Sequence, residues 1–272
     1  MSQPIGVFDS GVGGLSVLKH LVHFLPSEHY VYLGDTARVP YGNKSVETVQ
    51  QYSKQCTQFL LRQNVKLIVV ACNTASSVAM DIIRACSSVP VIGVIEPCAQ
   101  AVCEQTRNGV IGVIGTRATV GSKAYEEAIF SKAGSKVMAK DMRVLSQACP
   151  LFVPLAEEGW TAHPASRAIA KEYLRSFREA GADTVVLGCT HYPLLVDIIQ
   201  DAVPDAALVD PGRYAALEAL RLLQESGQLA EAKDEPTTDI DFYVTDIPST
   251  FAQVAKQFLG FDVASPHLAH VE

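Results

Sequence analysis

Long apolar runs are missing from the 272 residues: no stretch approaches the roughly 20 apolar residues that crossing a bilayer requires, so we expect no membrane partner. Runs of lysine and arginine are missing too. Acidic residues outnumber basic ones by 29 to 22, which gives a formal net charge of −7. Non-specific nucleic-acid binding depends on clustered positive charge, and we therefore expect no nucleic-acid partner either.

The seven cysteines lack the spacing of a disulfide framework or a metal site. Their number is odd, and the pair Cys98 and Cys103 has no tight histidine pair beside it, so we expect no metal centre. Residues 1–4 have neither the basic region nor the apolar region of a secretion signal. These features favour a cytoplasmic protein with reduced thiols.

Short runs rich in valine, isoleucine and leucine alternate with amphipathic segments along most of the chain. The runs predict strands at 5–8, 30–33, 69–72, 90–95, 110–116, 136–140, 185–189, 207–209 and 240–244. The amphipathic segments predict helices at 15–25, 45–63, 74–86, 120–133, 164–180, 214–225 and 249–258, with a short helix after Pro193 and a loop at 149–159. This alternation indicates an α/β protein with parallel sheets covered by helices on both faces.

Three landmarks occur twice in the same order, at separations of 106, 117 and 114 positions. They are Ile5-Gly6-Val7 with Ile111-Gly112-Val113, Cys72 with Cys189, and Glu96-Pro97 with Asp210-Pro211. The repetition predicts two similar parallel-sheet α/β domains related by a pseudo-twofold. About sixty residues follow the second copy, so we expect the tail to return to the first domain. The first domain would then comprise 1–97 and 210–272, and the second 98–209.

Polar side chains follow most of the predicted strands. In open parallel sheets, ligands bind beyond the carboxyl ends of the strands, and two such edges facing each other would form an interdomain cleft. The candidates are Asp9, Ser10, Asp35, Cys72, Asn73, Thr74, Thr116, Cys189, Thr190, His191 and Asp210.

Two of the seven thiols, Cys72 and Cys189, stand at strand ends among hydrogen-bonding residues, whereas we expect the other five to be ordinary buried side chains. A following helix N-terminus is expected to lower the pKa of both thiols. Asp9 is the candidate proton partner of Cys72 and His191 that of Cys189. Thiols on opposite faces of one carbon suit inversion of a stereocentre, because one removes a proton while the other delivers one.

Other interpretations of these residues stay open. Asp9 could cap a helix, and His191 could be an ordinary satisfied polar residue. The turn Gly11-Val12-Gly13-Gly14 could bind phosphate, although Ser16 occupies the third glycine's place in the usual motif. Cys189 and His191 could form a hydrolase pair, but a base two positions away is expected to point away from its neighbour's sulfur. A non-catalytic module that binds acidic metabolites is a further alternative.

Five motifs together resemble the cofactor-independent glutamate racemases of the aspartate/glutamate racemase superfamily. They lie at 6–14, 34–42, 71–75, 152–157 and 187–195. The resemblance implies a homodimer that interconverts L- and D-glutamate for peptidoglycan precursors, without pyridoxal phosphate or metal. An aspartate or hydantoin racemase on the same fold is the neighbouring interpretation.

The resemblance also implies roles for individual residues. Cys72 would take the α-proton of D-glutamate with help from Asp9, and Cys189 that of L-glutamate with help from His191 and Glu157. Glu157 is preferred to the adjacent Glu158. The amino acid would be held by Asp9, Ser10, Tyr41, Gly42, Asn73, Thr74, Thr190 and His191.

Overall fold

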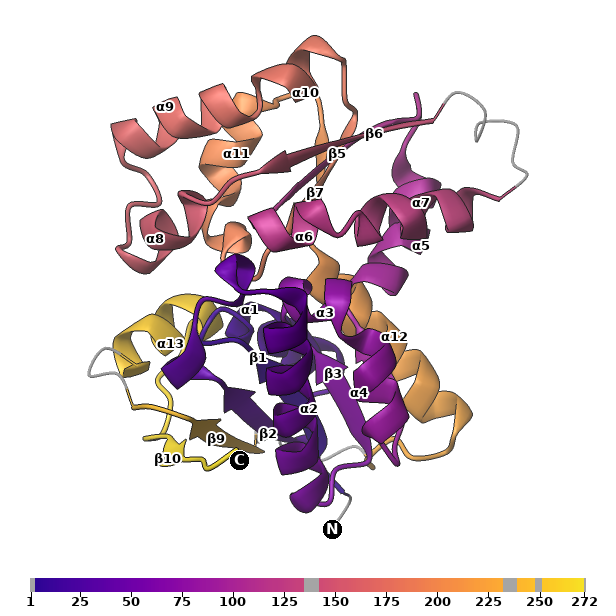
Figure 1. Ribbon diagram of the computed structural model, residues 1–272, viewed down its shortest axis with the longest axis vertical. Coiled ribbons are helices and arrows are strands. Elements are labelled where there is room, and N and C mark those ends of the chain that lie inside the picture. Colours follow the sequence, from indigo (N-terminus) through magenta and orange to yellow (C-terminus); the bar gives the residue numbers. More distant parts are fainter. Residues whose placement is uncertain (1–2, 135–141, 232–238, 248–250, 272) are drawn as a thin grey trace.

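The computed structural model describes residues 3–134, 142–231, 239–247 and 251–271, and these form two units, each built on its own parallel sheet (Figure 1). The strand order is β10-β9-β2-β1-β3-β4 in the first sheet and β6-β5-β7-β8 in the second. Four strands of the first sheet, β2-β1-β3-β4, therefore match the whole of the second in relative order. The prediction of two similar parallel-sheet α/β units is confirmed.

The first sheet contains β1 (Ile5–Asp9), β2 (His29–Gly34), β3 (Leu67–Val70), β4 (Val91–Gly93), β9 (Asp239–Val244) and β10 (His267–Leu268), and the second contains β5 (Val110–Gly115), β6 (Arg143–Ala148), β7 (Thr184–Gly188) and β8 (Ala207–Val209). The helices are α1 (Leu15–Phe24), α2 (Val46–Arg62), α3 (Asn73–Val78), α4 (Met80–Cys86), α5 (Ile95–Gln105), α6 (Arg117–Gly121), α7 (Ala124–Ala133), α8 (Phe152–Glu157), α9 (Pro164–Tyr173), α10 (Arg175–Glu179), α11 (Val196–Ala202), α12 (Pro211–Glu225) and α13 (Phe251–Leu259).

Side chains alternate between the two faces of each central strand, which explains why helices cover both faces. In β1, Ile5 and Val7 join the apolar core beneath α1 and α12, whereas Phe8 joins the core beneath α2. In β5, Ile111 and Val113 join that first core, and Ile114 joins the one beneath α9 to α11. One apolar core thus runs through both units, and each unit has a second core of its own.

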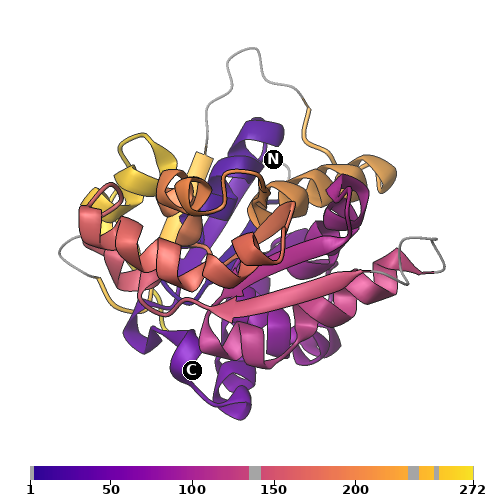
Figure 2. The ribbon, with the colours of Figure 1, turned by 90° about the horizontal axis from the view of Figure 1, so that it is seen from above.

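The chain passes between the units through α5 and α12, which pack against each other. Seen from above, the second unit lies over the first (Figure 2). After α12 the chain stays with the first unit, because β9 pairs with β2 and α13 packs on α1. The loops that can contact each other across the units are therefore those at the carboxyl ends of the central strands. These strands are β1 and β3 in the first sheet, and β5 and β7 in the second.

Three predicted long helices are each broken into two. The segment 74–86 divides at Ala79, 120–133 divides before Lys123 and 164–180 divides at Leu174. In α3 the hydroxyls of Ser76 and Ser77 bond to backbone carbonyls, which competes with continued helix. Lys123 adopts a positive φ of 59°, which interrupts the helical path.

Two further predictions about local structure were wrong. Glu96-Pro97 does not close a strand but lies in the first turn of α5, and the predicted loop at 149–159 contains α8. Pro97 and Pro154 are tolerated because first-turn amides have no partner within a helix. The strand predicted at 136–140 lies outside the described residues. On the side away from β7, β5 pairs with β6, which was not predicted because its side chains are exposed or half-buried and lack apolar alternation.

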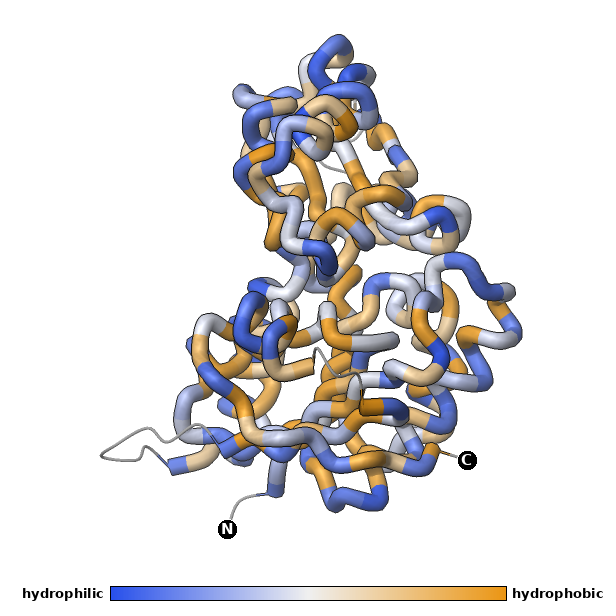
Figure 3. The backbone as a smooth tube through the Cα atoms, turned by 90° about the vertical axis from the view of Figure 1, so that its left-hand side faces the viewer, coloured by the Kyte–Doolittle hydropathy of each residue, from blue (hydrophilic) through white to orange (hydrophobic). Residues whose placement is uncertain are grey.

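Apolar segments lie mainly within the two units and polar segments along their outer turns (Figure 3). None of the helices in the described ranges combines the length and the apolar character that a bilayer crossing demands. No disulfide joins the seven cysteines, all of which fall in the described part of the chain.

Candidate active site

The two cysteines singled out from the sequence occupy equivalent places in the two sheets. Cys72 follows β3 and Cys189 follows β7, the strands that pair with β1 and β5 respectively. Asp9 is the last residue of β1, and Thr116 directly follows β5. Because all of these strands are parallel, their carboxyl ends share one edge of each sheet. The expectation that polar residues gather at strand ends is confirmed.

Cys72 caps the first turn of α3, with its sulfur accepting a hydrogen bond from the Ala75 amide at 3.4 Å. Its side chain is almost fully buried beside Asp9, which is itself fully buried. The Asp9 Oδ2 atom accepts a hydrogen bond from the Gly11 amide at 3.0 Å. The other oxygen, Oδ1, has no hydrogen-bond partner among the described residues. This carboxyl group therefore retains one acceptor for a proton or a ligand.

Burial dominates the acid–base properties of this first group. It raises the pKa of Asp9, although the positive charge of His191 and backbone amides act in the opposite direction. Burial and the negative charge of Asp9 raise the pKa of the Cys72 thiol to about 12, against hydrogen bonds from Ala75 and Ser10 that lower it. The expectation that a helix N-terminus would lower the pKa of Cys72 is wrong, because desolvation outweighs that effect. Cys72 is a neutral thiol at neutral pH.

Cys189 belongs to a second group that contains a cation. The Sγ atom of Cys189 lies 3.8 Å from Nδ1 of His191, and Nε2 of His191 lies 3.0 Å from Oε1 of Glu157. His191 adopts helical dihedral angles, and the chain then curls into the 3-10 turn Tyr192–Leu195, which returns the imidazole towards the sulfur. The expectation that a base two positions away would point elsewhere was therefore wrong.

Local structure and packing hold the imidazole of His191 in place. Glu157 is the last residue of α8, so the helix that was not predicted is the one that supplies the carboxylate. On another side, the ring of Phe258 in α13 meets the imidazole edge-on, with centroids 5.7 Å apart. Glu158 lies beside Glu157 but makes no such contact with His191 among the described residues.

The charge state of His191 follows from its two partners. Burial lowers the pKa of His191, but the hydrogen bonds that the imidazole donates to Cys189 and Glu157, together with their negative charges, outweigh it and raise the pKa to about 10. His191 is therefore an imidazolium at neutral pH. A cation in contact with sulfur stabilises a thiolate. The first group thus contains a neutral thiol, and the second places a cation beside the sulfur.

The two groups meet through a glycine. A Cβ atom on Gly13, in the loop after β1, would lie 2.4 Å from Thr190 Oγ1 and 2.7 Å from His191 Nδ1. A Cβ atom on Gly14 would lie 2.4 Å from Cβ of Asp9. Contacts this close leave no room for any side chain larger than hydrogen. Close packing of the loop therefore accounts for both glycines, which favours that interpretation over phosphate binding.

Three hydrogen-bonded contacts also join the units at this edge. The Tyr125 hydroxyl donates to Asn73 Oδ1 at 2.6 Å, and Thr74 Oγ1 lies 3.0 Å from Thr116 Oγ1. Thr119 completes a cluster of three hydroxyl groups, at 3.2 Å from Thr74 and 3.0 Å from Thr116. Sequence reasoning missed Thr119. The available signal was its spacing from Thr116, which caps α6 by accepting the Thr119 amide.

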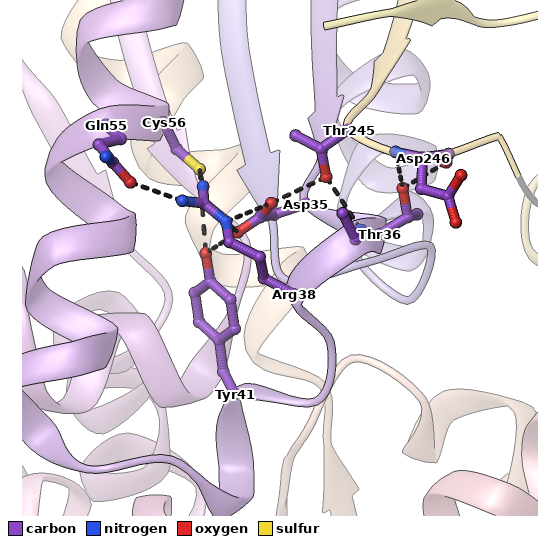
Figure 4. A network of polar contacts seen from close by, with 9 residues as sticks. Asp35, Thr36, Arg38, Tyr41, Gln55, Cys56, Thr245 and Asp246 are labelled. Carbon is purple, nitrogen blue, oxygen red and sulfur yellow. Dashed lines mark hydrogen bonds and ion pairs between the residues drawn. The ribbon is translucent and has the colours of Figure 1, made fainter. Parts of the chain in front are cut away.

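Tyr41 is the predicted site residue whose polar group points elsewhere. Its hydroxyl donates to the buried carboxylate of Asp35, which also accepts from Arg38 and Thr245 (Figure 4). The adjacent Gly42 does face the other unit, since a Cβ atom there would lie 2.7 Å from Cβ of Thr116. Asp35, a candidate from its place after β2, thus holds the loop that carries Gly42.

A cavity of about 410 Å³ opens beside this region and is lined by both Glu157 and Glu158, by Gly11 and Val12, and by the face of α13 that includes Gln257. A larger cavity of about 620 Å³ lies between α4, α5 and α7 and contains none of the residues predicted for the site. Within the described ranges, no three His, Cys, Asp or Glu side chains are grouped as a metal site.

Comparison with known proteins agrees with this geometry. Residues 5–219 match the family model described as Asp/Glu/hydantoin racemase. The chain belongs to the Asp/Glu/hydantoin racemase family. Relatives of this racemase-family chain include the glutamate racemase of Syntrophus aciditrophicus, 49% identical over 95% of this chain and 93% of the relative, and that of Geobacter metallireducens, 47% identical over the same shares.

A solved structure shows the same fold over the full length of this family member. The glutamate racemase of Francisella tularensis, crystallised in complex with D-glutamate, is 38% identical and superimposes with a TM-score of 0.91, covering 100% of this chain and 98% of the other. The resemblance noted from five sequence motifs is thereby confirmed at the level of the family and the fold.

Proposed function

We propose that this chain is a glutamate racemase, which interconverts L- and D-glutamate by moving the α-proton between Cys72 and Cys189. One observation carries the proposal most directly: thiols at equivalent strand ends of two similar sheets belong to groups that contact two adjacent glycines, with Asp9 against Gly14 and His191 against Gly13. Family membership and the names of relatives up to 49% identical support the same substrate. The proposed reaction requires neither pyridoxal phosphate nor metal.

For L-glutamate, Cys189 acts as thiolate and takes the α-proton, so that the C–H bond breaks and an S–H bond forms. The Cys72 thiol then delivers its proton to the opposite face of the carbanion and becomes a thiolate. Its neighbour Asp9, with a raised pKa and a free Oδ1, is placed to share that proton. Positioned acid–base groups contribute about 10²–10⁴-fold each, so the carbanion also needs electrostatic stabilisation.

The reverse reaction needs the opposite protonation pattern. For D-glutamate, Cys72 must first lose its proton, and Asp9 is the acceptor that the geometry offers. The Cys72 thiolate then takes the α-proton, so that the C–H bond breaks and an S–H bond forms. The Cys189 thiol delivers its proton to the opposite face of the carbanion and becomes a thiolate, with His191 and Glu157 supporting the exchange. Each catalytic cycle therefore leaves the two thiols in exchanged states.

The remaining site residues would bind the amino acid. Hydroxyl and amide donors suit its two carboxylates, and the backbone amides at the start of α3 add further donors. Tyr41 and Gly42 would contribute through their backbone, since the Tyr41 hydroxyl is bonded to Asp35. The proposed set comprises Asp9, Ser10, Tyr41, Gly42, Asn73, Thr74, Thr190 and His191.

The larger organisation follows the same proposal. The domains would comprise 1–97 with 210–272, and 98–209, with glutamate bound in the cleft between them. The resemblance to glutamate racemases supports a cytoplasmic homodimer that supplies D-glutamate for peptidoglycan. Sedimentation of the purified chain at several concentrations would test the dimer independently of activity.

Circular dichroism tests the function directly. The purified protein should abolish the optical signal of either L- or D-glutamate, while aspartate and hydantoins should turn over far more slowly. Cys72→Ala and Cys189→Ala should each lose racemisation, whereas Cys86→Ala, which changes a half-buried thiol in α4, should retain it. Racemisation by either of the first two variants at a near-normal rate would refute the two-cysteine mechanism.

A second candidate function rests on the chain Cys189–His191–Glu157. A sulfur, an imidazole and a carboxylate in contact are also the arrangement of a cysteine hydrolase. Incubation with activated esters followed by mass spectrometry of the intact protein distinguishes the two functions. A hydrolase forms an acyl-enzyme on Cys189, whereas a racemase of glutamate forms none.

A further inference from the structure

Tyr125 touches both of the segments that carry the proposed catalytic cysteines. It lies in the first turn of α7 and is 2% exposed. A Cβ atom on Gly188, directly before Cys189, would lie 3.2 Å from the Tyr125 ring, and the Tyr125 hydroxyl bonds to Asn73, directly after Cys72. One rigid side chain thus spans the interval between the two cysteine segments.

The hydrogen bond of Tyr125 crosses from one unit to the other, whereas that of Tyr41, a buried tyrosine that also donates to a side chain, stays within the first unit. The hydroxyls of Tyr30, Tyr32 and Tyr192 each donate to backbone carbonyls. Tyr125 instead donates to the side chain of Asn73, which comes from the other sheet unit and is itself 5% exposed. Such a bond fixes the orientation of a carboxamide that backbone geometry alone leaves free to rotate.

The direction of the bond determines what Asn73 can offer a ligand. A carboxamide has one oxygen acceptor and one NH₂ donor, and the tyrosine hydroxyl occupies the oxygen. Within the described part of the chain, Nδ2 of Asn73 donates to no other residue. Asn73 therefore presents a donor to the site, which suits a carboxylate. With the opposite orientation, the Asn73 side chain would present its oxygen to the site and repel a carboxylate.

We propose that Tyr125 is a positioning residue for the substrate: by holding the Asn73 oxygen, it keeps the Asn73 amide directed at a carboxylate of glutamate. This inference rests on the proposed function. Tyr125 does not exchange the proton, and it acts on binding through Asn73. Because glutamate keeps its carboxylates throughout the reaction, the interaction is similar in the bound substrate and in the transition state.

Tyr125→Phe tests the inference because it removes only the hydroxyl. The KM for both enantiomers should rise about 10-fold, the equivalent of one hydrogen bond, while kcat changes much less. Tyr30→Phe is the matched control, since it also removes a buried hydroxyl but lies under α1, away from the site. Both variants should lose melting temperature, and only Tyr125→Phe should raise KM.

A double-mutant cycle separates positioning from general structural damage. If Tyr125 acts through Asn73, then Asn73→Ala combined with Tyr125→Phe should show the same KM as Asn73→Ala alone. The inference would be overturned if the KM increases of the two single variants multiplied in the double variant, or if Tyr125→Phe were active with an unchanged KM. Either result would leave the proposed function standing. An unmodified protein that does not racemise glutamate would overturn both.

Discussion

Nε2 of His191 lies 3.0 Å from Oε1 of Glu157, while the opposite nitrogen of the same ring lies 3.8 Å from the sulfur of Cys189. The imidazole is therefore held between a carboxylate and a thiol. His191 is almost buried, whereas 42% of the Glu157 side chain is exposed. Glu157 thus connects a buried ion pair to the cavity beside α13.

Glu157→Gln should impair catalysis through His191. The variant keeps the shape of the side chain but removes the charge that favours the imidazolium, and kcat/KM should fall by about 10²-fold. The loss must be equal for L- and D-glutamate, because enantiomers have equal free energy in water. Glu158→Gln is the matched control in the same cavity and should leave kcat/KM close to that of the unmodified protein. A large loss of kcat/KM in Glu158→Gln, with little loss in Glu157→Gln, would show that Glu158 is the carboxylate that supports His191.

The His191 ion pair should make stability depend on pH in one direction. The folded pKa of about 10 lies above the reference value of 6.5, so the stabilisation is complete below about pH 6.5 and is lost as pH rises towards 10. Urea unfolding of the unmodified protein and of His191→Asn between pH 6 and pH 10 measures this. The difference in unfolding free energy should shrink as pH rises, and a constant difference would contradict the ion pair.

Tyr41→Phe should weaken the fold more than it weakens substrate binding. The hydroxyl donates to a fully buried carboxylate, and losing a hydrogen bond to a charged group costs about 1.5–3 kcal/mol of unfolding free energy. Tyr52→Phe is the control, because its ring still stacks on Arg38, 4.1 Å from the guanidinium carbon. Urea denaturation and a measured KM distinguish the two effects. A large rise in KM without loss of stability would place the hydroxyl at the substrate.

Lys66→Met should be among the most destabilising changes far from the site. Lys66 and Glu28 form an ion pair at 2.6 Å, with side chains 2% and 1% exposed. Removing one partner leaves a buried charge, at a cost of about 3–5 kcal/mol. Arg175→Met breaks an exposed pair with Glu172 and should cost less than about 1 kcal/mol. Similar unfolding midpoints for the two variants would show that burial does not govern the Lys66 pair.

The sequence was sufficient to predict most of the strands and the places of the two cysteines, but not β6 or β10. Runs such as Val69-Val70 and Val185-Val186 identify buried parallel strands, and the polar residues after them indicate the edge at which a ligand is expected. The matching strand order of the two sheets agrees with the repeated landmarks. These features depend on local pattern, which a single sequence contains.

Contacts between the units could not be predicted in the same way. Tyr125 and Asn73 are 52 positions apart, and nothing near either residue signals that they touch. The raised pKa of Cys72 depends on burial beside Asp9, which arises only when β1 and β3 pair. The turned imidazole of His191 and the helix that ends at Glu157 likewise depend on packing. Local sequence indicates which residues are candidates for the site, and tertiary structure determines their pKa values.

Gly13 gives experimental control over how closely the two units approach. A methyl group at this position would clash with the side chains of Thr190 and His191 and push them away from the loop after β1. Gly13→Ala should therefore hold the two units further apart. Such an inactive form, with a wider gap between the units, could be crystallised and used to study how inhibitors enter the site.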